Sequence, residues 1–286
     1  MKKPDFTIRP MKSSDVGHAM KLSDAEGWNQ TTIDWNLLVE GSQNICLLAE
    51  HDRKIIGTTT AINYANRIAW IGMVLVAKEH RRQGVSKSLL QRVLKALEGV
   101  QCVKLDATSQ GQHVYKQFDF NDEYLIARLV NSFMKELPAD DDRSVEPIML
   151  SDQEEIIALD ELVFGANRAQ LIQSMIKIFP EKAWLLKRDN SIIGFALGRR
   201  GNRFHQVGPV FASNINDVKL LVRKALKELN NRPVVIDVLC DKENLITWLE
   251  SFGFAPQRHF VRMYKTQNPF PGIIDKQYAI CGPEFG

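Results

Sequence analysis

Three segments with different patterns of apolar and polar residues follow one another between residues 71 and 97. The run Ile71-Gly-Met-Val-Leu-Val-Ala77 is almost wholly apolar and predicts a buried strand, and residues 78–83 after it are all polar. Beyond Gly84, apolar side chains recur every four residues from Val85 to Leu97, which predicts an amphipathic helix. The pattern therefore predicts a strand, a polar loop and a helix in direct succession.

The predicted start of this helix has the features of an anion-binding site. The first turn of a helix exposes free backbone N–H groups and carries a partial positive charge. Gly84 lets the backbone approach a phosphate closely, and Arg81, Arg82 and Lys87 add positive charge. Two interpretations remain open on this chemistry alone: a nest for a pyrophosphate, or a solvated basic turn before an ordinary helix.

The remaining pattern in residues 1–135 predicts an α+β fold, in which helices flank a mixed sheet. Ser13-Ser-Asp15 is a helix N-cap signal, and a hairpin is predicted around His51-Asp-Arg53. The predicted strands are 6–10, 45–50, 54–62, 67–77, 102–107 and a last element from residue 120, and the predicted helices are 16–25, 32–39, 84–97 and 110–118.

After a proline and a run of acidic residues the sequence repeats itself. Pro10 and Asp15 reappear as Pro147 and Asp152 at the same offset, and Ile56-Gly57 reappears as Ile193-Gly194. We therefore predict two copies of one fold in tandem, with a first domain at 1–136, a linker at 137–143, and a second domain with a C-terminal tail at 144–286.

The second copy lacks the chemistry of the first. Ala212–Leu220, which stands where the basic loop and helix start should be, contains neither a glycine nor an Arg-x-x-Gly pattern. Pro209 removes a hydrogen-bond donor from its central strand. The second domain is therefore predicted to be degenerate.

Composition narrows the class of protein. The chain has 286 residues, of which 44% are hydrophobic and 25% charged, which is typical of a soluble globular protein. A net charge of +3 does not favour nucleic-acid binding. The four cysteines are far apart and predict no metal site, and we find neither a signal-peptide pattern nor an apolar stretch long enough to cross a membrane. We expect a cytoplasmic protein, either a monomer or a homodimer.

Arg81-Arg-Gln-Gly-Val-Ser86 resembles the Arg/Gln-x-x-Gly-x-Gly/Ala signature of the GNAT superfamily of acyl-CoA N-acyltransferases, with Ser86 in place of the final glycine or alanine. The predicted order of elements along residues 1–135 matches that superfamily as well. Val207-Gly-Pro-Val210 and Arg262-Met263 extend the resemblance to bacterial tandem GNAT proteins with a degenerate second domain. The resemblance implies a catalytic first domain and a second domain that packs against it and helps to enclose the acceptor.

The resemblance also implies a site for acetyl-CoA, with no metal. The strand Val74-Leu75-Val76 would pair with the pantetheine, and a backbone N–H near Val74 or Val76 would stabilise the oxyanion. Tyr115, five residues before Phe120, would protonate the leaving thiolate, although Asp119 replaces the usual glycine of this motif. Glu26 and Trp28 would lie beside the acceptor. The pyrophosphate would be held by Arg81, Arg82, Gln83, Gly84, Val85, Ser86 and Lys87.

These expectations favour an N-acetyltransferase that moves an acetyl group to the amine of a small molecule in a ternary complex. Two alternatives stay open: a non-catalytic, regulatory acyl-CoA-binding protein, and a protein N-acetyltransferase. Residues 70–74 contain no carboxylate or histidine, so no general base is identified there. Glu26, Asp106 and Asp237 are considered as bases, and proton transfer through solvent is preferred.

Overall fold

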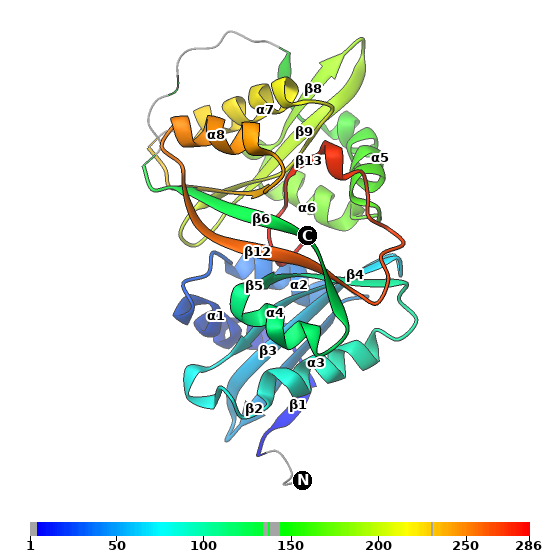
Figure 1. The fold of residues 1–286 in the computed structure, drawn as a ribbon, viewed down its shortest axis with the longest axis vertical. Helices are drawn as coiled ribbons and strands as arrows, with labels where there is room; N and C mark the ends of the chain where they lie inside the picture. The colour runs from blue at the N-terminus through cyan, green and yellow to red at the C-terminus, as the bar shows by residue number, and fades with distance from the viewer. Residues whose placement is uncertain (1–4, 134–136, 138–143, 230) are drawn as a thin grey trace.

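The computed structural model describes residues 5–133, 137, 144–229 and 231–286, and shows two halves stacked along the long axis of the molecule (Figure 1). The predicted α+β fold is confirmed. In the first half the predicted elements all form, with ends within three residues of the predicted ones. Its strands are β1 (Thr7–Pro10), β2 (Ile45–His51), β3 (Lys54–Tyr64), β4 (Ile68–Val76), β5 (Cys102–Thr108) and β6 (Phe120–Asn131), and its helices are α1 (Val16–Ala25), α2 (Thr32–Glu40), α3 (Val85–Ala96) and α4 (Ser109–Lys116).

The second half repeats this order of elements, which confirms the predicted tandem arrangement. One additional strand, β13, follows the repeat. The strands are β7 (Val145–Pro147), β8 (Trp184–Arg188), β9 (Ser191–Arg200), β10 (His205–Ala212), β11 (Val234–Leu239), β12 (Ala255–Lys265) and β13 (Gln277–Ala279), and the helices are α5 (Gln153–Phe164), α6 (Ala169–Ile178), α7 (Ile215–Lys227) and α8 (Glu243–Ser251).

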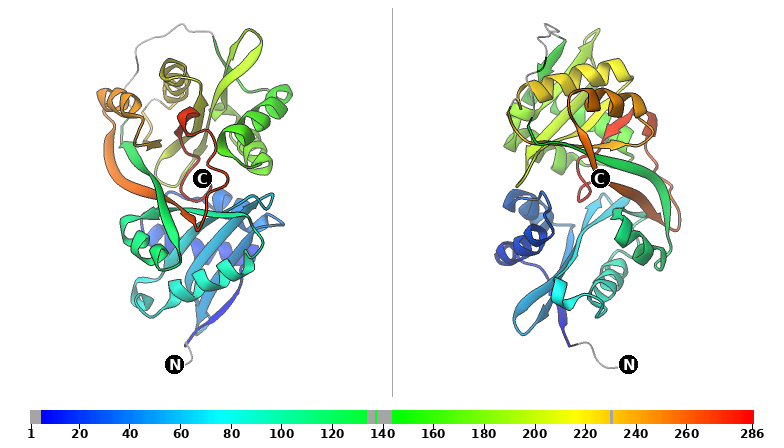
Figure 2. Two further views of the ribbon diagram at one scale, coloured as in Figure 1. Left: turned by 45° about the vertical axis from the view of Figure 1, so that its right-hand side comes forward. Right: turned by 60° about the vertical axis from the view of Figure 1, so that its left-hand side comes forward.

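The two halves share one sheet because each gives its last long strand to the other. In the described residues the strand order is β1-β2-β3-β4-β5-β12-β6-β11-β13-β10-β9-β8-β7. Strand β12 of the second half therefore lies between β5 and β6, and β6 pairs with β11. Both exchanged strands can be followed across the middle of the molecule in Figures 1 and 2. Of the predicted linker 137–143, only Leu137 belongs to the described residues, and its side chain is buried.

Two equivalent ion pairs hold the exchanged strands. Arg262 on β12 binds Asp106 on β5 through two hydrogen bonds of 2.9 Å, and Arg128 on β6 binds Asp237 on β11 through bonds of 2.7 and 2.8 Å. All four side chains are almost completely buried. Burial alone would lower the pKa of Arg262, but the carboxylate of Asp106 raises it above its usual value. Each pair thus joins one half to the other.

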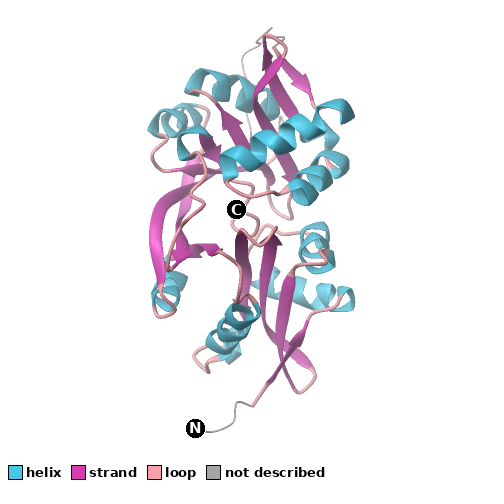
Figure 3. Ribbon diagram, turned by 90° about the vertical axis from the view of Figure 1, so that its right-hand side faces the viewer, coloured by secondary structure: helices cyan, strands magenta, loops and turns pink. Residues whose placement is uncertain are grey.

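Helices cover both faces of the first half of the sheet. The apolar side of α3, with Val85, Leu89 and Val93, packs on one face. Helices α1 and α2 cover the opposite face, where Trp35 and Trp70 are fully buried. The sheet is seen between the two pairs of helices in Figure 2, and the layers are coloured by type in Figure 3. Among the described residues, no helix has the length and apolar character needed to cross a bilayer.

The last residues of the chain return to the first half. Trp70 Nε1 donates to the carbonyl of Pro283 at 2.9 Å, and the hydroxyl of Tyr64 donates to the carbonyl of Phe285 at 2.8 Å. A Cβ on Gly72 would lie 3.0 Å from the Cα of Glu284, so a side chain here would push this segment away from β4. Residues 283–285 are therefore packed against the central strand of the first half.

We expect Asp237→Ala to destabilise the whole molecule by about 3–5 kcal/mol, because it leaves the buried guanidinium of Arg128 without its carboxylate. Chemical denaturation followed by circular dichroism measures the loss. Asp122→Ala is the matched control, because it removes an ion pair to Lys116 in which both side chains are more than 40% exposed. The control should cost less than about 1 kcal/mol. Equal losses in the two variants would contradict this account of the exchanged strands.

Candidate active site

Strands β4 and β5 separate part of the way along their length. They pair in parallel from Ile68 and Cys102 to Ile71 and Leu105, and the pairing stops beyond Ile71 and Leu105. Met73 adopts a positive φ of 50° at a register shift between β3 and β4. A bulge of this kind bends a strand, and here it accompanies the opening between β4 and β5.

A cavity of about 1030 Å³ occupies this opening. Both halves of the chain line it. Of the residues predicted for the site, the cavity wall contains Glu26, Trp28, Val74, Leu75, Val76, Arg81, Arg82, Val85, Ser86 and Tyr115. Gln83, Gly84 and Lys87 are not part of the wall, and the Gln83 side chain donates to the Glu79 carbonyl at 3.1 Å. The structure thus brings together predicted residues that are up to 89 positions apart, from Glu26 to Tyr115.

The start of α3 lies at one end of the cavity. Gly84 adopts a left-handed conformation with φ of 82°, and the space where a Cβ would lie is empty to 4 Å. No side chain of the described residues caps α3, so its first N–H groups have no side-chain acceptor. Arg81 fixes the loop, because its Nε donates to the Val76 carbonyl at 3.2 Å and its Nη2 binds Glu26 at 2.5 Å. The loop and helix start can bind an anion.

The cavity passes through the sheet from one face to the other. On β5, Leu105 and Ala107 belong to the core beneath α3, so the alternating side chains of Asp106 and Thr108 face the opposite side. The cavity is lined by Val85 and Tyr115 from the α3 side, and by Asp106 and Thr108 from the α1–α2 side. Two molecules can therefore approach each other from the two faces of the sheet.

The backbone of β4 offers free hydrogen-bonding groups inside the opening. Ala77 N donates to the Ile56 carbonyl on β3 at 2.8 Å. Because successive peptide groups of a strand point to alternate sides, Val76 and Val74 direct their N–H groups away from β3. The bond from Arg81 Nε to the Val76 carbonyl agrees with this orientation. These two N–H groups face the part of the cavity where β5 no longer pairs with β4.

Tyr115 lies on α4 at the α3 side of the cavity. Thr108 caps α4 by accepting from Gly111 N at 3.2 Å, and the Tyr115 ring lies 5.9 Å from the Phe120 ring. No hydrogen bond joins the Tyr115 hydroxyl to any residue that the structure describes. Burial raises the pKa of Tyr115 above its usual value, so the hydroxyl is protonated at neutral pH. His113, two residues earlier, is exposed and does not line the cavity.

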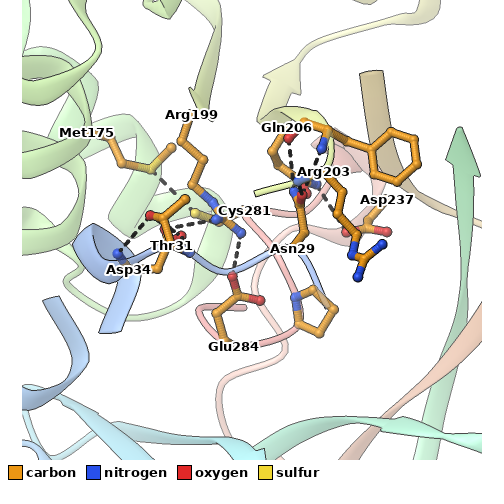
Figure 4. A network of polar contacts seen from close by, with 12 residues as sticks. Asn29, Thr31, Asp34, Met175, Arg199, Arg203, Gln206, Asp237, Cys281 and Glu284 are labelled. Carbon is orange, nitrogen blue, oxygen red and sulfur yellow. Dashed lines mark hydrogen bonds and ion pairs between the residues drawn. The ribbon is translucent and has the colours of Figure 1, made fainter. Parts of the chain in front are cut away.

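The second half fixes the loop that carries Glu26 and Trp28. Asn29 Oδ1 accepts from the backbone N–H groups of Arg203 (3.0 Å) and Phe204 (2.9 Å), and Asn29 Nδ2 donates to the Phe204 carbonyl at 3.1 Å (Figure 4). Sequence reasoning did not identify Asn29, because its partners are about 175 positions away. These hydrogen bonds hold the loop against the second half.

A buried charged network lies behind this loop (Figure 4). Arg199 donates to Asp34 at 2.8 Å through Nη1 and to Glu284 through Nη2. Burial raises the pKa of Glu284, and the positive charge of Arg199 offsets this increase only in part. Glu284 Oε2 and Gln30 Oε1 are buried without a hydrogen-bond partner in the described residues, and both residues line the cavity. Sequence reasoning missed Gln30, Arg199 and Glu284, which carry no local motif.

The corresponding opening in the second half is filled by the chain itself. Strands β10 and β11 pair in parallel only as far as Val207 and Ile236. Beyond this point β13 inserts between them, with Ala279 opposite both Val210 and Val238. The start of α7 is also occupied, because Asn214 accepts from the N–H groups of residues 216 and 217. Within the described residues, neither a strand edge nor a helix start is left for a ligand here.

The described part of the chain contains no group of three or more His, Cys, Asp or Glu side chains that could hold a metal ion.

Comparisons with known proteins agree with this arrangement. A family model described as "Acetyltransferase (GNAT) family" matches residues 16–120, and one described as "Acetyltransferase (GNAT) domain" matches residues 156–279. The chain is 26% identical to "Holothin acyltransferase" of Pseudoalteromonas sp. (strain SANK 73390) over 98% of this chain and 95% of the relative.

Solved structures share the fold. A crystal structure of a protein assigned to the acetyltransferases from Pyrococcus horikoshii has a TM-score of 0.83 and 24% identity, and the match covers 100% of this chain and 98% of the other. A tandem GNAT protein from the clavulanic acid biosynthesis pathway has a TM-score of 0.58 and 11% identity, over 91% and 98% of the two chains. With a GNAT match in each half, the chain belongs to the GNAT acetyltransferases and carries two domains of this family in tandem.

Proposed function

We propose that this acyltransferase is an N-acetyltransferase that moves the acetyl group of acetyl-CoA to the amine of a small molecule by direct attack in a ternary complex. Members of the family generally use acetyl-CoA. The observation that carries the proposal is a cavity that crosses the sheet between β4 and β5, with an anion-binding helix start at one end and a chamber lined by both halves of the chain on the other face.

The donor is proposed to lie along β4. The pyrophosphate would be bound by the N–H groups at the start of α3, with Arg82 and Lys87 near its charge. The pantetheine would pair with the backbone N–H groups of Val74 and Val76, which point away from β3. This arrangement brings the thioester to the bulge at Met73, where the opening between the two strands begins.

The proposed reaction needs three contributions from the protein. The neutral amine attacks the thioester carbonyl, and an N–H group of Val74 or Val76 stabilises the oxyanion. The tetrahedral intermediate then breaks its C–S bond, and Tyr115 protonates the leaving thiolate. The nitrogen loses its excess proton to water, because Glu26 and Asp106 are each engaged by an arginine. Bound together, the two substrates react without a covalent enzyme intermediate.

The size of the acceptor is limited by the exchanged strands and by the last residues of the chain. Arg128, Phe260 and Pro283 close the cavity on the acceptor face, and the loop with Trp28 is held down by the bonds of Asn29. These contacts favour a small molecule over an extended peptide. In the second domain β13 takes the space that a pantetheine would need, which supports acetyl-CoA binding by the first domain alone.

We expect Gly84→Glu to weaken acetyl-CoA binding by about 100-fold or more, because a carboxylate at the start of α3 repels the pyrophosphate and its backbone N–H groups are obstructed. Calorimetric titration of acetyl-CoA measures the change and should show one site per chain in the unaltered protein. Gly99→Glu is the matched control, since Gly99 also has a positive φ, of 98°, and nothing within 4 Å of its Cβ position. Two sites in the unaltered protein, or equal weakening by both variants, would contradict the proposal.

We expect Tyr115→Phe to lower kcat by about 10²–10⁴-fold while KM for acetyl-CoA changes little, because only the proton donor is removed. Release of the CoA thiol measures the rate. Tyr264→Phe, on a half-buried tyrosine outside the cavity wall, should leave kcat unchanged. Since the pKa of Tyr115 is raised, the rate should rise with pH as the amine loses its proton and should not fall before about pH 10. An unchanged kcat in Tyr115→Phe would remove this residue from the mechanism.

A further inference from the structure

The charged side chains on the acceptor face of the cavity are almost all neutralised within the protein. Asp106 is bound by Arg262, and Arg128 by Asp237, in each case through two hydrogen bonds. Glu284 and Asp34 share Arg199. Each of these charged groups thus has an oppositely charged partner within the protein, so a charged side chain without such a partner is available to a ligand.

Arg258 is such a side chain. It lies on β12 opposite Arg128 of β6, directly after a register irregularity, and it lines the cavity. Its side chain is half-buried, yet it makes no hydrogen bond or ion pair with any residue in the described part of the chain. Burial lowers the pKa of Arg258, the nearby charge of Arg128 lowers it further, and Asp237 opposes them only in part. An anion in the cavity would offset the repulsion between the two arginines.

The position of Arg258 separates it from the donor's phosphates. Phe260, two residues along β12, faces away from α3 and packs with Ile126 of β6. Arg258 has the same orientation on the strand, since side chains two apart share a face. The start of α3 lies on the opposite face of the sheet. The uncompensated guanidinium is therefore directed to the acceptor.

We propose that the acceptor carries a carboxylate in addition to its amine, and that Arg258 binds this carboxylate. The inference rests on the proposed function. A guanidinium presents two parallel N–H groups that match a carboxylate, and one unpaired positive charge balances one negative charge, whereas a phosphate dianion would need more. The amine faces the buried Gln30 Oε1, which lacks a partner among the described residues. Trp28, Met73 and Phe260 supply apolar walls between these ends, which fits an amino acid with an apolar side chain.

The test compares matched acceptors: L-phenylalanine, L-leucine and L-methionine, their amides, and the amines that lack the carboxylate. With acetyl-CoA, we expect kcat/KM to be at least about tenfold higher for an amino acid than for its amide or amine. Arg258→Met should abolish this preference through KM for the acceptor, and Arg258→Lys should restore part of it. Arg200→Met, on an exposed arginine outside the cavity wall, should behave as the unaltered protein.

A binding measurement separates failure of this proposal from failure of the proposed function. Calorimetry with N-acetyl-L-phenylalanine and N-acetyl-L-phenylalaninamide reports the carboxylate site without turnover. If N-acetyl-L-phenylalanine binds, its amide does not, and Arg258→Met loses the binding, the carboxylate site is supported even if no amine causes release of CoA. Turnover that is equal for acids, amides and amines and unchanged in Arg258→Met overturns the site and leaves the acetyltransferase intact. Absence of both binding and carboxylate-dependent turnover also overturns it.

Discussion

The exchange of β6 and β12 between the two halves is the constraint on which the rest of the structure depends. A strand that leaves its own half must find its hydrogen bonds and its charge partners in the other. Arg262 finds Asp106, and Arg128 finds Asp237, at equivalent positions of the repeat. A buried guanidinium without its carboxylate is costly, so these two pairs favour one register of the shared sheet over its alternatives.

The same exchange explains why one half keeps an open cavity and the other does not. Strand β12 continues beyond the end of β5 and contributes Arg258 and Phe260 to the cavity wall of the first half. The chain after β12 then places β13 between β10 and β11, where the second half would otherwise be open. The second domain thus forms part of the proposed acceptor chamber, and its own opening is closed by hydrogen bonds that a ligand would otherwise make.

The sequence predicted the elements, which the structure confirms, and it also predicted the proposed donor side of the site, because both depend on local patterns. The four-residue spacing of apolar residues from Val85 onward predicts α3. The left-handed conformation of Gly84 is required by the turn directly before this helix, so it too depends on local sequence. The repeated aspartates Asp106 and Asp237 indicated a shared structural role, which the ion pairs agree with. The exchange itself could not be predicted, because a single GNAT domain and an exchanged pair have the same order of elements. Asn29, Arg258 and Glu284 acquire their roles only from partners at least 85 positions away or from the cavity itself.

The helix start of α3 and the proposed acceptor chamber differ in how much of the chain is needed to build them. A phosphate-binding helix start needs only backbone N–H groups and a glycine, so it can be encoded in six residues and retained while the rest of the sequence changes. An acceptor chamber must match the charge and shape of one molecule, and the walls of the proposed chamber come from the α1–α2 loop, the exchanged strands and residues 283–284. Because Arg258 makes no ion pair with the described residues, a substitution at this one proposed position can change which acceptor is favoured without breaking an internal contact.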